Sequence, residues 1–248
     1  FPIRVARLVA LHSLGFERDL EIGLASIAGR DAAFCIHVAE GTNGRAAREV
    51  VGLDRLGMLD SRLIAVHAIG VDAEGIARLE KAGAAVVWCP TSNGFLFGTT
   101  APRALLDGKV DVLLGTDALL TGEGTLLDEL HAARRLGYLD DRRLGAAIGE
   151  TAARRLGLPV PSLAPESAAD VIVLRAPLLT ASAADVALVI VAGRPVLADA
   201  SIAPALGRFG TPIMVGGVRK VVRADLALAA ARVRAACPDL AIFEEVVL

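Results

Sequence analysis

The sequence predicts an α/β fold built around a parallel sheet. Short apolar runs bounded by turn residues alternate with segments of helical spacing through the first two thirds of the 248 residues. The runs are almost continuously apolar, as expected for parallel strands that are covered on both faces. Five strand-then-helix units are visible, with strands expected at Val5–Leu11, Phe34–Val38, Leu63–Ala68, Ala84–Cys89 and Asp111–Thr116.

The segments between these strands carry signals for the starts and ends of helices. Asp72 is a suitable N-cap, and Gly83 is placed to end the helix that follows it. Pro102 suits the first position of another helix. Thr125 and Asp128 have the spacing of a capping box. Helices are therefore expected over Ala73–Ala82, Leu126–Leu136 and Asp140–Leu156.

The composition changes after a proline-punctuated connection, Leu158–Pro165. Beyond it, β-branched runs predict a small β unit, and apolar residues at helical spacing predict a helix between Val218 and Cys237. The β-branched runs are Asp170–Leu174, Val186–Ala192 and Val196–Ala198. We therefore expect an α/β domain over residues 1–160, β strands over residues 166–200, and a C-terminal tail with a helix over residues 201–248.

Composition limits the classes of partner. A formal net charge of −2 gives no electrostatic reason to expect a nucleic acid or an anionic membrane, so a small molecule is the expected partner. No apolar stretch approaches the roughly 20 residues that span a bilayer, and no cleavable signal is apparent. The three cysteines lack metal-finger spacing, which favours reduced thiols. Together these features predict a cytoplasmic location.

Polar side chains suited to hydrolysis lie at the ends of three of the apolar runs. His37 and His67 lie at the ends of two runs, and Asp117 follows a third. Because the carboxyl ends of parallel strands meet at one edge of a sheet, these side chains could supply three ligands to a catalytic zinc. Glu40, just beyond the His37 strand, is placed to carry protons between water and a substrate nitrogen.

Each of these residues also has an ordinary structural interpretation. A strand histidine is more often a core or loop residue than a ligand, and Asp117 could simply cap a turn. The coincidence of three candidate ligands and a carboxylate at one sheet edge favours the functional interpretation. His131, in the middle of a helix among charged residues, is expected on a solvated face, and His12 is intermediate. The segment from Cys89 to Asn93 has no nucleophile motif and is expected to be a loop that lines the pocket.

Five motifs follow one another along the chain: His37-Val-Ala-Glu40, Val66-His67-Ala-Ile-Gly70, Trp88-Cys-Pro-Thr-Ser-Asn93, Gly115-Thr-Asp117 and Thr151-Ala-Ala-Arg-Arg-Leu-Gly157. Together they resemble the amidohydrolase superfamily. In order and spacing they are similar to its deaminase and chlorohydrolase branch, which includes guanine deaminases, cytosine deaminases and triazine hydrolases. Segments Ala169–Leu174 and Val189–Arg194 also resemble the composite β-sandwich of that branch. The resemblance covers about Val5 to Val196.

The resemblance implies a partial TIM-type (β/α) barrel, in which the strands here are the fourth to the eighth, followed by the C-terminal part of a small β-sandwich. It implies one divalent metal, zinc or iron, bound by His37 and Asp117. His67 would stabilise the attacked substrate or the attacking water, although the strand-end argument leaves it open as a third ligand. Asp117 would also act as the base toward water.

The same resemblance implies the residues that meet the substrate. Glu40 would be the proton shuttle and would contact the substrate. His12 matches a strand-end histidine that contacts substrate in this branch, and Asn93 matches a loop position near the pocket.

The sequence departs from the pattern of this branch in one respect. The His-x-His pair of the first barrel strand is absent from the sequence, and five strands cannot close an eight-stranded barrel. The expected explanations are that the sequence is the remainder of a longer protein, that a second chain supplies the missing strands, or that the form is degenerate. Because Phe1 is not an initiator methionine, we expect the first. Separately, the resemblance implies a homodimer.

Two hypotheses for function follow. The leading one is a metal-dependent hydrolase that acts on a C–N bond, by deamination, or on a C–Cl bond of a small heterocycle. The competing one is a non-catalytic or partner-dependent partial barrel that lacks two of the usual metal ligands.

Overall fold

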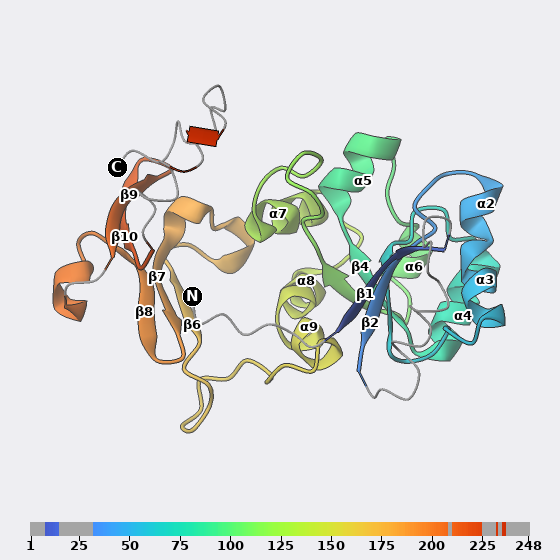
Figure 1. The fold of residues 1–248 in the computed structure, drawn as a ribbon, viewed down its shortest axis with the longest axis horizontal. Helices are drawn as coiled ribbons and strands as arrows, with labels where there is room; N and C mark the ends of the chain where they lie inside the picture. Colours follow the sequence, from blue (N-terminus) through green and yellow to red (C-terminus); the bar gives the residue numbers. More distant parts are fainter. Residues whose placement is uncertain (1–7, 15–31, 208–209, 225–231, 233–234, 237–248) are drawn as a thin grey trace. The chain divides into compact units, whose positions relative to one another are not determined.

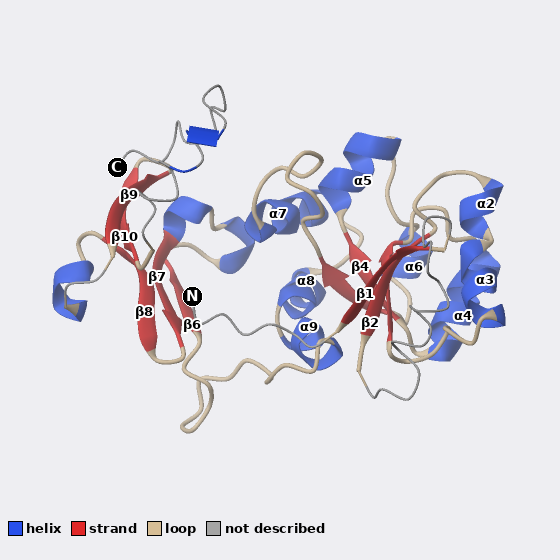
Figure 2. Cartoon of the chain, in the orientation of Figure 1, coloured by secondary structure: helices blue, strands red, loops and turns tan. Residues whose placement is uncertain are grey.

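The computed structural model describes residues 8–14, 32–207, 210–224, 232 and 235–236. These residues fall into two compact units, with the division between Val160 and Pro161. Figure 1 labels the elements along the chain, and Figure 2 shows that strands alternate with helices in the first unit, while the second unit is built mainly of strands.

The first unit contains a five-stranded parallel sheet. Each strand pairs with the next one along the chain, in the order β1-β2-β3-β4-β5. This sequential parallel order is that of a (β/α) barrel, of which five strands are described, and it confirms the predicted fold class. The strands are β1 (Val9–Ser13), β2 (Phe34–Val38), β3 (Leu63–His67), β4 (Ala85–Trp88) and β5 (Asp111–Leu114).

Eight described helices accompany these strands, and α8 and α9 pack against β5. The predicted caps are confirmed where they were most specific. The Asp72 side chain accepts a hydrogen bond from the Gly75 N–H at 2.8 Å, and Thr125 forms a capping box with Asp128. The helices are α2 (Gly44–Ala47), α3 (Glu49–Arg55), α4 (Ala73–Ala82), α5 (Pro90–Phe97), α6 (Arg103–Leu106), α7 (Leu126–Leu136), α8 (Asp141–Ile148) and α9 (Glu150–Arg155).

Three details of the first unit differ from the sequence prediction. The first strand is Val9–Ser13 rather than Val5–Leu11, so His12 lies within it; residues 5–7 lie outside the described residues. The long predicted helix is two helices, because Gly149 leaves helical geometry with φ −120° and ψ −109°. Pro90 begins helix α5 where a loop was expected, since its fixed φ suits a first helical turn.

The core of the first unit comes from the apolar runs that predicted its strands. Alternate residues of β2 are buried on one side, whereas β3 is buried along nearly its whole length, as expected for an inner parallel strand. The largest buried side chains on the strands are Phe34, Ile36, Leu63, Ile64 and Trp88. This packing makes the strand ends rigid supports for the side chains that follow them.

The second unit is a five-stranded antiparallel sheet in the order β6-β7-β8-β10-β9. Its strands are β6 (Val171–Leu174), β7 (Val186–Val191), β8 (Arg194–Asp199), β9 (Thr211–Val215) and β10 (Val218–Val222), with 3-10 turns η1 (Leu178–Thr180), η2 (Ala183–Asp185) and η3 (Ala203–Leu206).

The start of the C-terminal tail is a hairpin rather than a helix. Gly216 and Gly217 have φ values of 52° and 77°, which suit a tight turn between β9 and β10. The β-branched residues of Val218–Val222 then pair with both neighbouring strands, so the prediction of a helix from Val218 was wrong. Most of its remaining span, including residues 225–231, lies outside the described residues.

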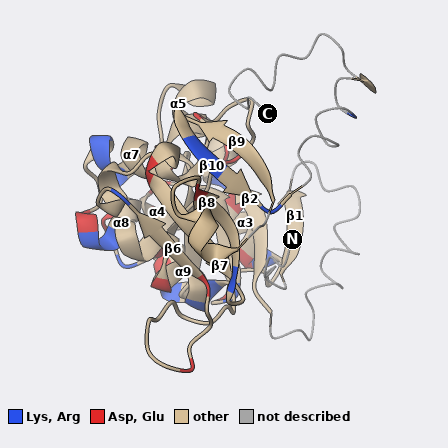
Figure 3. Ribbon diagram, turned by 90° about the vertical axis from the view of Figure 1, so that its left-hand side faces the viewer, with Lys and Arg blue, Asp and Glu red and all other residues tan. Residues whose placement is uncertain are grey.

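Positively and negatively charged residues are intermixed in the described structure. Figure 3 shows basic and acidic positions close together on the same elements, as on α8, whose first residues are Asp141, Arg142 and Arg143. This mixture agrees with the formal net charge of −2. Among the described residues, the helices are all too short or too polar to span a membrane.

Candidate metal centre

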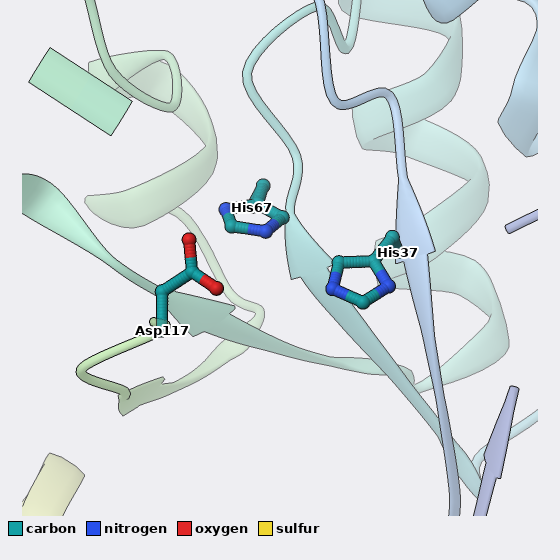
Figure 4. Close-up of side chains that lie close together, drawn as sticks. All are labelled: His37, His67 and Asp117. Atoms are coloured by element: carbon teal, nitrogen blue, oxygen red, sulfur yellow. The ribbon is translucent and has the colours of Figure 1, made fainter. Parts of the chain in front are cut away.

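Three predicted ligands come together at the carboxyl edge of the parallel sheet. His37 lies on β2, His67 is the last residue of β3, and Asp117 follows β5. One ligand atom from each of them lies within 4.8 Å of the others, and Figure 4 shows the three side chains around a shared space. The sequence therefore located a cluster whose members are separated by up to 80 residues in the chain.

The backbone is strained where two of these ligands leave their strands. His67 and Asp117 have φ values of 71° and 54°, and Ala39 and Ala68 beside the site have φ values of 52° and 53°. Each such left-handed conformation costs a non-glycine residue roughly 1–2 kcal/mol. Strain of this kind is concentrated at functional sites, where the surrounding packing maintains it.

Both histidines are held so that one ring nitrogen stays available. The Nδ1–H of His37 donates to the carbonyl oxygen of His12 at 2.7 Å, and the Nδ1–H of His67 donates to Oδ1 of Asn93 at 2.8 Å. The Nε2 lone pair of each ring is therefore available for a ligand. Metal-binding histidines are commonly oriented by a hydrogen bond of this type from the other ring nitrogen. The two rings are nearly parallel, with centroids 5.2 Å apart.

Asp117 is oriented by hydroxyl groups that sequence reasoning did not identify. The Ser92 hydroxyl donates a short hydrogen bond to Oδ2 of Asp117, and the Thr121 hydroxyl lies 3.4 Å from the same oxygen. The second carboxylate oxygen can therefore face a cation. The position of Ser92 just after the β4 strand could have indicated this role. It was missed because a loop was expected where helix α5 begins.

Glu40 lies beside the available nitrogen of His67. Its Oε1 is 3.7 Å from Nε2 of His67, which is 1% exposed, whereas the Glu40 side chain is 30% exposed. Glu40 thus connects the buried site with solvent.

Of the three residues predicted to contact substrate, two line the same pocket and one does not. His12 and Glu40 line a pocket of about 310 Å³, together with Ser13, Asn43, Arg45, Ala46 and Glu49. Asn93 is fully buried instead, because α5 replaces the expected loop, and its amide NH₂ donates to Thr100 at 3.2 Å. The observed contact of Asn93 is with His67, and its contact with substrate stays a prediction.

The other candidate groups near the site have different environments. Burial, together with the negative charges of Asp117, Glu129 and Glu40, raises the pKa of Cys89 to about 12. Cys89 is therefore a neutral thiol near pH 7 and a poor nucleophile. His131 lies outside the cluster of three. The residue is half-buried, and its Nε2 is buried with no hydrogen-bond partner among the described residues, so the ring is less solvated than predicted.

The donor set fits a divalent cation. Two imidazole nitrogens and one carboxylate oxygen are the ligands that catalytic zinc sites use, and such sites keep a further position open. Iron accepts the same ligands. The fixed tautomers of His37 and His67 support this fit, because their Nδ1 protons point away from the shared space.

Comparison with known proteins identifies relatives among deaminases. No protein-family model matches the chain. Aminodeoxyfutalosine deaminase from Deinococcus radiodurans is 40% identical over 114 residues, which are 45% of this chain and 27% of that protein. A 5-methylthioadenosine/S-adenosylhomocysteine deaminase from Haloquadratum walsbyi is 35% identical over 147 residues, 55% of this chain and 32% of that protein.

A similar fold is present in solved structures. An adenosine deaminase from Xanthomonas campestris with bound zinc superposes with a TM-score of 0.71 at 22% identity, over 91% of this chain and 55% of that chain. The likeness at this identity concerns the fold. The chain spans about half the length of this structural neighbour, and its matches cover about a third or less of the two curated relatives.

Proposed function

We propose that the chain belongs to the amidohydrolase superfamily, in its deaminase and chlorohydrolase branch, and that it carries part of the catalytic site of a metal-dependent deaminase. The substrate is an amino-substituted heterocycle, and an adenine nucleoside is the first choice, since the name of one relative specifies adenosine derivatives. In the reaction water adds to the ring carbon, the C–N bond breaks, and ammonia leaves.

The convergence of His37, His67 and Asp117 is the observation that carries this proposal. These residues would hold one zinc or iron ion. The ion would lower the pKa of a water molecule to about 7, which makes it a nucleophile near neutral pH.

The remaining steps belong to side chains of the chain. Glu40 lies beside His67 at the border between the buried site and the pocket, so its carboxylate can take a proton from water and deliver it to a ring nitrogen. Asp117 is the second base, oriented by Ser92. His12 shares the pocket with Glu40 and is proposed to contact the substrate.

Metal content tests this proposal directly. Purified protein should contain about one equivalent of zinc or iron by elemental analysis, and His37→Ala should lose it because one of three ligands is removed. His131→Ala is the matched control: it removes a histidine from outside the cluster and should keep the metal.

The competing function has a distinct result in the same experiment. A non-catalytic partial barrel, or one that needs a partner chain, predicts no stoichiometric metal in either the native protein or His37→Ala. That result would reject a self-sufficient metal centre. Metal binding that is present but weak would instead favour a site completed by further ligands.

A further inference from the structure

We propose that Glu129 is a positioning residue of the candidate metal centre and acts through the first turn of helix α5. This inference rests on the proposed function, because a positioning role requires that the metal centre exists. Three consecutive residues of that turn each bond to a different part of the unit: Thr91 to Glu129 on α7, Ser92 to Asp117 after β5, and Asn93 to His67 at the end of β3.

Glu129 supplies the cap that helix α5 lacks locally. The first N–H groups of a helix have no partner within the helix, and the Cys89 side chain does not cap them. Oε2 of Glu129 accepts the Thr91 N–H at 3.2 Å, and Oε1 accepts a short hydrogen bond from the Thr91 hydroxyl. A negative charge at this position is also favoured by the helix dipole.

The cap is costly, which argues that it has a purpose. Glu129 is 1% exposed, and removing a carboxylate from water is unfavourable. Burial raises the pKa of Glu129, while the two hydrogen bonds from Thr91 oppose that rise. An apolar residue at this position would pack α7 against α5 without that cost, but it could not fix the first turn of α5.

The first turn of α5 connects Glu129 to two of the proposed ligands. Ser92 and Asn93 are both fully buried, and they follow Thr91 within one rigid helical turn. A displacement of Thr91 therefore moves the hydroxyl that orients Asp117 and the amide that holds the Nδ1 proton of His67. Outer contacts of this kind typically change metal affinity by about 10- to 100-fold when they are lost.

The test is nitrogen NMR of the His67 ring in this chain, without metal. In the native protein His67 should be the Nδ1–H tautomer, because Asn93 accepts that proton. Glu129→Ala should lose this preference and bind zinc about tenfold more weakly in a chelator competition. Glu129→Gln should keep both the Nδ1–H tautomer and the native zinc affinity, since its amide oxygen can still accept the Thr91 N–H.

Three further variants decide the interpretation. Asn93→Ala should lose the His67 tautomer, and Glu123→Ala, which removes an exposed carboxylate that pairs with Arg135, should keep it. If Glu129→Ala keeps the tautomer that Asn93→Ala loses, Glu129 has no positioning role and the inference fails. If Glu129→Ala does not fold, Thr91→Val removes only the hydroxyl bond; a partial loss of the tautomer then supports the inference and an unchanged ring overturns it.

The failure of the proposed function would look different. If the native protein binds no zinc, the proposed metal centre is wrong. The tautomer of His67 in the Glu129 variants still decides whether Glu129 positions the His67 ring. If Glu129 has only a structural role, Glu129→Ala should lower the thermal stability and leave the His67 tautomer unchanged.

Discussion

Replacing Glu40 by Gln should reduce the proposed deamination by about 10²- to 10⁴-fold, the usual contribution of a general acid or base. Glutamine has the size and polarity of glutamate but cannot carry a proton between water and a ring nitrogen. Glu40 lies outside the cluster of three proposed ligands, so the variant should bind metal as tightly as the native protein. The measurement is the rate of ammonia release from zinc-loaded protein with an adenine nucleoside, alongside zinc content.

Glu49→Gln is the matched control for this experiment. It removes one charge from the same pocket, and its amide oxygen can still accept the Ala39 N–H that Glu49 accepts at 2.7 Å. We expect Glu49→Gln to keep most of its activity. Equal losses in the two variants would mean that the pocket needs negative charge rather than a proton carrier at Glu40. Loss of zinc in Glu40→Gln would make Glu40 a ligand instead of a proton shuttle.

Lys220→Met should destabilise the antiparallel sheet by about 3–5 kcal/mol, the usual cost of breaking a buried ion pair on one side. Lys220 and Asp199 are paired across β10 and β8, and both are 1% exposed. The Lys220 ammonium donates to Asp199 at 2.9 Å and to the carbonyls of Ala184 and Val186 at 2.8 and 2.7 Å. Methionine fills the same space but leaves these three acceptors without their donor.

Amide hydrogen exchange in β8 and β10 measures the free energy of opening this sheet. Arg219→Met is the matched control, because Arg219 precedes Lys220 on the same strand and is exposed, so a change within about 0.5 kcal/mol is expected. A loss from Lys220→Met no greater than that of the control would show that Lys220 contributes packing alone. Arg175 also pairs with Asp199, so part of its charge stays compensated in the variant.

Much of the first unit follows from local sequence. The five parallel strands were predicted because their apolar runs are short and bounded by turn residues, and α4 and α7 because Asp72, Thr125 and Asp128 mark their starts. The proposed ligands were also predictable, since the carboxyl ends of parallel strands share one edge. A polar residue at the end of such a strand is therefore brought near its counterparts whatever its distance along the chain.

Local pattern was insufficient where two structures suit the same residues. Val218–Val222 continues into a segment of helical spacing, but pairing with β8 and β9 makes it a strand, because strand formation depends on which neighbours are available. Likewise, Pro90 and the residues after it suit a loop or a helix start. The decision depends on partners for the first N–H groups, and Glu129 on α7 provides one.

The sequence by itself determined the strands of the parallel sheet and the main helix caps, because burial pattern and capping are properties of neighbouring residues. It also predicted that His37, His67 and Asp117 lie close together, because strand ends share one edge of the sheet. The tertiary structure decided how those side chains are oriented. The bonds from Thr91 to Glu129, Ser92 to Asp117 and His67 to Asn93 join residues 38, 25 and 26 positions apart. No periodicity in the chain encodes such pairs, since they form only when α5, α7 and the strand ends have already packed together.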